Sequence, residues 1–295
     1  MRIFFIGNVR FSEAMLNLLI EHPDAEIVGI ATKSQSRFNS DHVNLSSIAE
    51  DNGIEYKFVK DINAQPILEW IESLKPEVIY CFGWSSLIKE ELLNLSPLGV
   101  IGYHPAELPM NRGRHPLIWA LALGLERTAS TFFKMDVGAD SGDILSQDFI
   151  PIEREDYAAD LYRKIIESAK TQVHKFTYQL AKREHTFTAQ DHTKANLWRK
   201  RGIKDGLIDF RMPSDSIYNL IRGLSKPYVG AHIDFQENEC KVWTAKPCDD
   251  AYPNFEPGKV LEINSQGGIK VVTGSSSIWL LEHEIPTIEN IEYLF

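Results

Sequence analysis

Residues 77–104 read EVIYCFGWSSLIKEELLNLSPLGVIGYH, a pattern of strand, helix and strand. The apolar runs at 77–82 and 100–103 are short and typical of buried strands, whereas 87–95 carries its apolar residues at helical spacing. Two buried strands joined through a helix predict parallel strands of one sheet. We therefore expect the fold to be built around this unit.

The same alternation of strand and helix extends toward the N-terminus. Residues 1–6 and 26–31 are predicted strands, and helices are predicted at 11–19, 44–52 and 67–74. This order indicates an α/β fold with a mostly parallel sheet covered on both faces, in which ligands collect at the carboxyl ends of the strands. The first turn lacks the G-x-G-x-x-G pattern, which argues against a nicotinamide cofactor.

The character of the sequence changes near residue 190. One long amphipathic helix is predicted at 157–181, and a polar stretch follows it. Beyond that stretch come a helix at 214–224 and short apolar runs separated by Gly, Pro and Asn, which predict a small β-barrel. We expect a first domain at 1–190, a linker at 191–205 and a C-terminal domain at 206–295.

Composition and charge narrow the class of function. The 295-residue chain is 43% hydrophobic and 24% charged, which is typical of a globular protein, and no apolar run is long enough to span a membrane. A formal net charge of −10 disfavours broad contact with nucleic acid. The three cysteines lack a Cys-x-x-Cys spacing and predict ordinary thiols, with neither a disulfide framework nor a zinc site. These features favour a cytoplasmic enzyme acting on a small molecule.

Two polar residues offer chemistry. His104 follows the strand at 100–103, and Asp140 lies in an acidic glycine loop at 136–143, which we also expect at the end of a strand. One histidine and one aspartate in such places are the minimum for moving protons during acyl transfer. Taken singly, either residue could equally satisfy a strand end or cap a turn.

Two longer motifs contain these residues, and they resemble motifs of the folate-dependent formyltransferases. Residues 102–113, GYHPAELPMNRG, match Asn-x-His-x-x-x-Leu-Pro-x-x-Arg-Gly except at the first position, and residues 136–144, DVGADSGDI, match Asp-x-Gly-x-Asp-x-Gly-x-Ile. The likeness continues through 204–210 and 221–228. It implies a Rossmann-like formyltransferase domain followed by a small OB-like β-barrel.

The resemblance implies transfer of a formyl group from 10-formyltetrahydrofolate to an amine, without a metal. It assigns His104 as the acid and base, and Asp140 as the partner that orients and holds the imidazole. The family has an asparagine at the position of Gly102, so one hydrogen-bond donor to the formyl oxygen is missing here.

Several groups could replace that donor. The candidates are Asn111, Ser130, Tyr103, backbone N–H groups and a water. Without a replacement, the protein would be a catalytically impaired relative that binds folate or a nucleotide.

The resemblance also implies a folate pocket. In the family, backbone groups of the segment matching 82–88 bind the pterin edge, and the loop matching 136–142 closes the other side. The implied residues are Phe82, Gly83, Trp84, Leu87, Ile88, Asp136, Gly138 and Asp140. Trp84, Leu87 and Ile88 could equally be core residues.

The amine substrate is inferred from charge and from one motif. The methionyl-tRNA branch of the family has a basic insertion and a positive second domain, whereas this chain is acidic. Residues 112–119 are closer to the branch that formylates nucleotide-linked amino sugars for lipopolysaccharide and other surface glycans, and guanidinium groups suit a diphosphate. The expected substrate-binding residues are Asn8, Arg10, Arg112, Gly113, Arg114, Arg199 and Arg201. A methionyl-tRNA substrate, a solvated linker at 199–201 and a homodimer stay open as alternatives.

Overall fold

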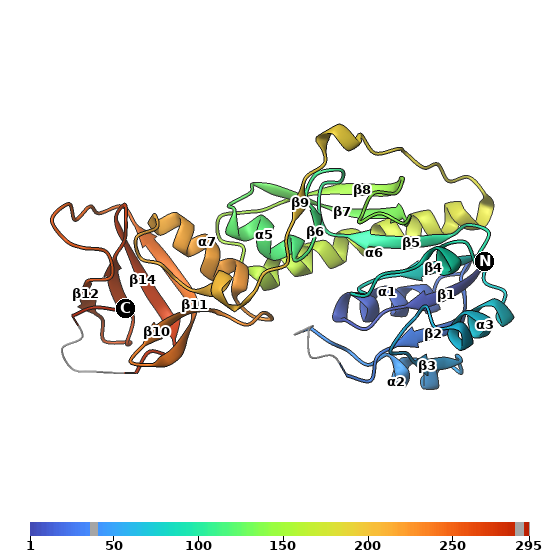
Figure 1. Cartoon of the computed structure of the whole chain (residues 1–295), viewed down its shortest axis with the longest axis horizontal. Coiled ribbons are helices and arrows are strands. Elements are labelled where there is room, and N and C mark those ends of the chain that lie inside the picture. Colours follow the sequence, from blue (N-terminus) through green and yellow to red (C-terminus); the bar gives the residue numbers. More distant parts are fainter. Residues whose placement is uncertain (36–40, 287–291, 295) are drawn as a thin grey trace. The chain divides into compact units, whose positions relative to one another are not determined.

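The computed structural model describes residues 1–35, 41–286 and 292–294 (Figure 1). The chain forms two compact units, each with its own sheet. Unit 1 consists of residues 1–116, 128–150 and 163–198, and unit 2 of residues 117–127, 151–162 and those from 199 onward.

Unit 1 is built on a seven-stranded sheet with the strand order β3-β2-β1-β4-β5-β7-β8. The first five of these strands are parallel, and β7 pairs with β5 in the antiparallel direction. The order reverses between β1 and β4, the point at which ligands commonly bind in such sheets. The strands are β1 (Arg2–Ile6), β2 (Glu26–Thr32), β3 (Tyr56–Phe58), β4 (Val78–Cys81), β5 (Val100–His104), β7 (Arg127–Lys134) and β8 (Ile144–Pro151). The predicted α/β fold with a mostly parallel sheet is confirmed.

Neighbouring residues of a buried strand point to opposite sides of the sheet, so both faces of this sheet carry apolar side chains. Helices cover both of these faces. Phe4 packs edge-on against Trp70 of α3, at a ring-centroid distance of 5.1 Å, whereas Phe5 packs on Phe82 at 5.7 Å. The helices are α1 (Arg10–Ile20), α2 (Ser46–Asp51), α3 (Gln65–Ser73), α4 (Glu90–Leu93), α5 (Pro116–Ala122) and α6 (Ala158–Lys182).

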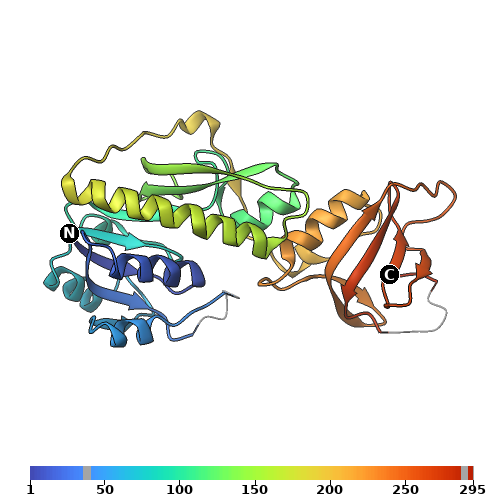
Figure 2. The ribbon, with the colours of Figure 1, turned by 180° about the vertical axis from the view of Figure 1, so that it is seen from behind.

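Helices α1 and α6 lie over one face of the sheet (Figure 2), and an aromatic cluster packs on that face. Phe82, which directly follows β4, contacts Phe132 of β7 at 5.2 Å, and Phe132 contacts Phe176 of α6 at 4.9 Å. All three rings are buried. Their tilted and edge-to-face packing fixes the residue after β4 against β7, the strand that pairs with β5, and the ends of β4 and β5 carry the predicted site.

Unit 2 combines a helix, α7 (Ser214–Leu224), with a five-stranded antiparallel sheet in the order β10-β11-β14-β13-β12. The strands are β10 (Ala231–Phe235), β11 (Asn238–Cys248), β12 (Val260–Ile263), β13 (Ile269–Val272) and β14 (Ser277–His283). The apolar face of α7 packs on this sheet, with Ile217 and Ile221 fully buried. The small β-domain predicted at the C-terminal end is confirmed.

The division of the chain differs from the predicted one at two places within residues 1–190. Ile118 of α5 packs into the core around α7, so 117–127 groups with unit 2. The buried guanidinium of Arg222 donates through Nη1 to the carbonyls of Glu153 and Asp156, at 3.0 and 3.2 Å, and thereby holds 151–162 in unit 2.

The stretch predicted as a linker is structured. Two short strands, β6 (Arg112–Gly113) and β9 (Leu197–Trp198), pair in parallel within unit 1, and two single-turn helices flank β9, η1 (His192–Lys194) and η2 (Ile203–Gly206). The strongly periodic helices agree better with prediction: α7 coincides with 214–224 and α6 lies within one residue of 157–181. The helix predicted at 87–95 is reduced to α4.

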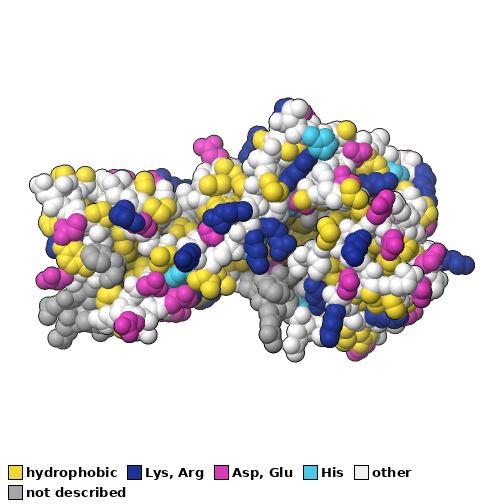
Figure 3. All heavy atoms as spheres, in the orientation of Figure 1, with side chains coloured by type: hydrophobic (Ala, Val, Ile, Leu, Met, Phe, Trp, Pro, Cys, Tyr) yellow, Lys and Arg dark blue, Asp and Glu magenta, His cyan; other side chains and the backbone are white. Residues whose placement is uncertain are grey.

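The cysteines are free thiols, as predicted. Burial raises the pKa of the Cys81 thiol to about 12, so this group stays protonated and unreactive at neutral pH. In the described part of the chain no helix combines the length and apolar character needed to cross a membrane. Acidic and basic side chains are interspersed over the face shown in Figure 3.

Candidate functional site

His104 ends β5 at the carboxyl edge of the sheet and is 5% exposed. Its Nε2 lies 2.8 Å from the carbonyl oxygen of Asn111, and its Nδ1 lies 3.6 Å from Oδ2 of Asp140. A carbonyl oxygen only accepts, so Nε2 carries the proton in this contact, and in the neutral tautomer the lone pair then lies on Nδ1. The open nitrogen of His104 therefore faces the carboxylate of Asp140.

Asp140 lies in the loop between β7 and β8, not at the end of a strand as predicted. Its backbone has a φ of +52°, in the left-handed region. Within the same loop, Oδ1 of Asp136 accepts from the Gly138 N–H at 3.0 Å and from the Ser141 hydroxyl at 2.7 Å. A Cβ at Gly142 would lie 1.7 Å from the Lys134 carbonyl, so only glycine fits there. The glycines of this motif let the loop fold tightly back on β7.

The carboxylate of Asp140 is held by a backbone group. The Gly113 N–H of β6 donates to Oδ2 of Asp140 at 2.9 Å. Gly113 has a φ of +106°, and a Cβ there would lie 2.3 Å from the carbonyl oxygen of Trp198 in β9. The structure thus gives the N–H of Gly113, a residue predicted to bind substrate, a contact with Asp140.

The position of the missing asparagine is filled by other side chains. A Cβ on Gly102 would lie 2.6 Å from Cγ of Met135, 2.9 Å from its sulfur and 3.2 Å from Cζ of Phe133. Alternation along β5 puts this position on the same face as His104. An apolar thioether therefore stands where the family pattern has an amide.

Two of the predicted replacement donors lie on the other face of the sheet. The Tyr103 ring stacks on Phe11 at 4.0 Å, and its hydroxyl accepts from the Ser130 hydroxyl at 3.2 Å. Burial raises the pKa of Tyr103, which keeps that hydroxyl neutral. Tyr103 and Ser130 are thus excluded, and of the three side chains named from the sequence Asn111 remains.

The predicted pterin segment divides into buried and open parts. The side chains of Phe82 and Ile88 are buried in the core, so any contact of these two residues with the cofactor would be made by their backbone, whereas Leu87 is 70% exposed. Trp84 is half-buried, and its Nε1 is buried without a hydrogen-bond partner among the described residues. The Lys33 ammonium lies 4.3 Å above the Trp84 ring. Together with Gly83, these groups leave an unused donor and an aromatic surface next to the end of β4.

The predicted substrate residues of unit 1 differ in their exposure. Asn8 is fully buried and its amide atoms have no partner in the described ranges, so the predicted direct contact with substrate does not fit its present environment. Arg10 and Arg114 are exposed. Nη2 of Arg112 contacts Oε1 of Gln190 at 2.6 Å and Nδ1 of His192 at 3.0 Å.

Arg199 and Arg201 belong to unit 2 and are engaged there. Arg199 donates to both carboxylate oxygens of Asp205, at 2.8 and 2.5 Å, and this pairing lowers the pKa of Asp205. Arg201 is buried over the ring of Trp119, 4.4 Å from its centroid, and donates to the backbone carbonyl of Asp205. The predicted diphosphate contact of these two arginines therefore competes with pairings inside unit 2.

Sequence reasoning missed two residues beside the site, Gln190 and Asn196. Gln190 is 5% exposed and donates to the backbone carbonyls of Asp140 and Gly142, while Oδ1 of Asn196 accepts from the Asn111 N–H. Both lie in a polar stretch without periodicity, so no signal in the sequence marked them.

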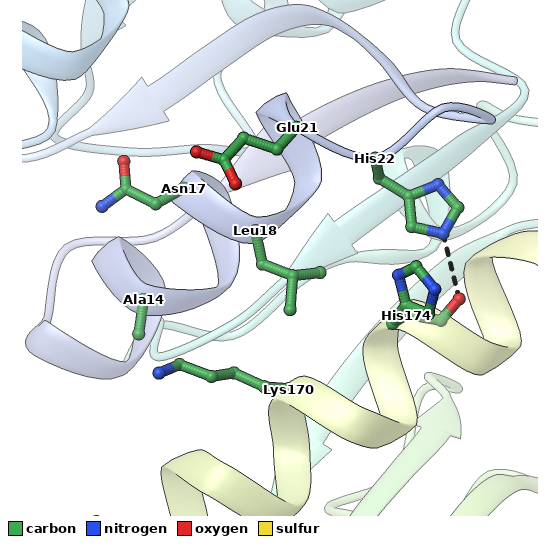
Figure 4. Close-up of a pocket in the computed structure, with 7 residues that line it drawn as sticks. All are labelled: Ala14, Asn17, Leu18, Glu21, His22, Lys170 and His174. Atoms are coloured by element: carbon green, nitrogen blue, oxygen red, sulfur yellow. Dashed lines mark hydrogen bonds between the residues drawn. The ribbon is translucent and has the colours of Figure 1, made fainter.

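A separate hollow of about 480 Å³ opens between α1 and α6 (Figure 4). It is lined by Ala14, Asn17, Leu18, Glu21, His22, Lys170 and His174. Both ring nitrogens of His22 are engaged, Nε2 with the His174 carbonyl at 3.0 Å and Nδ1 with the Asp24 N–H at 3.1 Å. None of the predicted site residues lines this hollow. Within the described ranges, no group of three or more His, Cys, Asp or Glu side chains could hold a metal ion.

A mostly parallel sheet whose histidine, at the end of a strand, faces an aspartate of a neighbouring loop is an arrangement typical of enzymes that move protons between reacting groups. Family models specify the group: residues 1–176 match the formyl transferase model, and residues 203–292 match the formyl transferase C-terminal domain. The chain belongs to the formyl transferase family, as its motifs predicted.

Solved structures with this fold include several formyltransferases. The N-formyltransferase from Helicobacter canadensis, solved in complex with folinic acid and dTDP-3-aminofucose, is 15% identical, with a TM-score of 0.70 over 95% of this chain and 98% of that chain. A 4-N formyltransferase from Francisella tularensis is 17% identical, with a TM-score of 0.66 over 81% of this chain and 94% of that one. Methionyl-tRNA formyltransferase from Clostridium thermocellum is 18% identical, with a TM-score of 0.59 over 84% of this chain and 94% of that one. At these identities the likeness establishes the fold.

The contact between Gly113 and Trp198 predicts that Gly113→Ala is strongly destabilising. A left-handed φ costs an alanine about 1–2 kcal/mol, and displacement of β9 adds to that cost. Gly53→Ala is the matched control, because Gly53 has a φ of +63° but nothing within 4 Å of its Cβ position. Urea unfolding should show a larger loss of unfolding free energy for Gly113→Ala; equal losses would contradict the close approach of Trp198.

Proposed function

We propose that the protein transfers the formyl group of 10-formyltetrahydrofolate to the amine of a nucleotide-linked amino sugar. The observation that carries the proposal is the facing pair, Nδ1 of His104 and Oδ2 of Asp140, at 3.6 Å. The two motifs that resemble those of the formyltransferases supply one member each. Their approach in space is what an acid and base with a charged partner requires.

The folate is proposed to bind between the segment at 82–88 and the loop at 136–142 of unit 1. The buried Nε1 of Trp84 lacks a partner among the described residues, and the tight loop at 136–142 presents backbone next to Asp140. An unused donor there suits a polar ring such as a pterin. Gly83, Trp84 and Leu87 would hold one side of the ring, and Asp136, Gly138 and Asp140 the other.

The bound folate supplies an electrophilic formyl carbon attached to a nitrogen that can leave. In the proposed transfer, a bond forms between the substrate amine and that carbon, and the bond to the folate nitrogen breaks. His104 accepts the proton of the attacking amine on Nδ1 and returns it to the leaving nitrogen. Asp140 faces the imidazolium that forms in between and stabilises its charge.

The choice of an amino sugar rests on charge and on the arginines of unit 1. The net charge of −10 and the interspersed charges of Figure 3 do not favour the many phosphate contacts of a tRNA. Arg10 and Arg114 are exposed, and Arg112 lies beside the Asp140 loop. Two or three guanidinium groups suit a diphosphate. A surface-glycan pathway would use such a product.

A second candidate is a catalytically impaired relative that binds folate or a nucleotide. The observation in its favour is Met135, which occupies the position of the family's asparagine and offers no hydrogen-bond donor. Turnover therefore decides between the two candidates.

Replacement of His104 by asparagine should lower kcat by at least about 10²-fold, because it removes the group proposed to take the proton. The dissociation constant for 10-formyltetrahydrofolate should stay within about threefold, since the imidazole acts on the reacting groups. Release of tetrahydrofolate and isothermal titration measure the two quantities. Turnover at the wild-type rate would contradict the assignment.

The acceptor should be identified by a panel of dTDP-linked 3-amino and 4-amino sugars assayed beside methionyl-tRNA. We expect tetrahydrofolate release with at least one sugar nucleotide and none with the tRNA. Turnover with tRNA that falls steeply with salt would show the phosphate contacts of the alternative substrate. Folate binding without turnover on any acceptor would favour the impaired relative.

The crowding at Gly102 predicts a coupling between positions 102 and 135. Gly102→Asn alone should destabilise the protein, because Cγ of Met135 lies 2.6 Å from the Cβ position. In a Met135→Ala background the same change should be tolerated and should raise kcat, since one donor to an oxyanion is worth about 10²–10³-fold. Urea unfolding and kcat of all four proteins measure this cycle. A kcat that does not rise would show that another donor already serves the formyl oxygen.

A further inference from the structure

Residues 188–198, which we call the strap, cross the site within unit 1. At one end, Thr188 and Ile144 exchange two backbone hydrogen bonds of 2.8 Å, which tie the strap to β8. At the other end, β9 pairs with β6, with the Arg114 N–H donating to the Trp198 carbonyl at 3.0 Å. Both ends are therefore fixed by backbone pairing, and the side chains between them are held over the two motifs.

Gln190 joins the strap to the loop that carries Asp140. Its Nε2 donates to the carbonyl oxygen of Asp140 at 3.0 Å and to that of Gly142 at 2.6 Å, and its Oε1 accepts from Nη2 of Arg112 at 2.6 Å. The amide thus uses both its donor and its acceptor end while 5% exposed. A carboxylate could not donate to the two carbonyls, and an apolar side chain would leave them without this partner.

Asn196 acts on the other motif, through the backbone of Asn111. Oδ1 of Asn196 accepts from the Asn111 N–H at 2.6 Å, and the Asn111 carbonyl accepts from Nε2 of His104 at 2.8 Å. Asn111 has a φ of +64°, a left-handed conformation that an asparagine tolerates but that needs support. The carbonyl that sets the tautomer of His104 is thus placed by a residue 85 positions away from Asn111 in the sequence.

We propose that the strap positions the catalytic pair, with Asn196 fixing His104 and Gln190 fixing Asp140. This inference rests on the proposed function, in which Nδ1 of His104 receives the proton. Neither strap residue touches the reacting atoms in this proposal. Asn196 holds the backbone of Asn111, whose carbonyl contacts His104, and Gln190 holds the backbone carbonyl of Asp140 itself.

The gap between His104 and Asp140 makes the rate of the proposed reaction sensitive to the position of either side chain. Nδ1 and Oδ2 lie 3.6 Å apart, too far for a direct hydrogen bond, and they are held by separate contacts to Asn111 and Gly113. A shift of His104 by a fraction of an ångström changes its reach toward an amine, and misplacements of about 1 Å cost about 10²-fold in rate. Loss of either strap contact is therefore expected to lower kcat.

The test compares two replacements of Asn196 that have nearly the same size. Asn196→Asp keeps an acceptor for the Asn111 N–H, whereas Asn196→Leu removes it. We expect kcat to fall by about 10- to 100-fold in Asn196→Leu and to stay within about threefold in Asn196→Asp. The KM for 10-formyltetrahydrofolate should change little in either variant, because the side chain of Asn196 acts on the backbone of Asn111 and not on a residue proposed to bind the pterin.

Two further variants complete the design. Gln190→Met, which removes both donors, should also lower kcat, and it keeps the proposal testable if Asn196→Leu does not fold. Lys194→Met is the control from the same strap, because the Lys194 side chain is 68% exposed and pairs only locally with Asp191; its kcat should equal that of the wild type.

The outcomes separate this inference from the proposed function. Wild-type kcat in both Asn196→Leu and Gln190→Met overturns the strap's role, provided that His104→Asn is inactive. Equal losses in Asn196→Asp and Asn196→Leu also overturn it, since the acceptor would then not matter. Full activity of His104→Asn overturns the proposed function itself, whatever the strap variants show.

Discussion

One backbone hydrogen bond, from the Gly113 N–H to the carboxylate of Asp140, sets the geometry on which the candidate site depends. It needs a residue without a Cβ, because the Trp198 carbonyl occupies the adjacent space. It also needs the pairing of β6 with β9, which brings the segment after α6 back to the motif that follows β5. The site is therefore built by the meeting of three chain segments that lie far apart in the sequence.

Much of the frame could be predicted from sequence periodicity. The parallel strands, α6 and α7 have strong periodic patterns, and each of the two motifs supplied one member of the facing pair, His104 and Asp140. The location of Asp140 was harder, because a glycine-rich motif does not tell whether its aspartate ends a strand or lies inside a folded loop. The direction of the Phe82 side chain was also hard to predict, since an aromatic residue after a strand can face the core, as it does here, or a ligand.

The hydrogen bonds of Gln190 and Asn196 beside His104 and Asp140 could not be predicted from the sequence. Gln190 and Asn196 lie 50 and 85 positions from their partners Asp140 and Asn111, in a stretch whose composition resembles a solvated linker. Side-chain hydrogen bonds to backbone groups carry no periodicity, so only the folded chain reveals them. For the arginines, the sequence indicated a contact that the fold makes less accessible. Arg199 and Arg201 were predicted to bind a diphosphate, but Asp205 pairs with Arg199 and the ring of Trp119 packs against Arg201 within unit 2.

The thioether of Met135 also limits what position 102 can hold. Because Met135 and Phe133 fill the volume next to Gly102, an asparagine cannot enter there without displacing packed atoms. The residues at positions 102 and 135 therefore share one volume, and the choice of side chain at either position constrains the choice at the other.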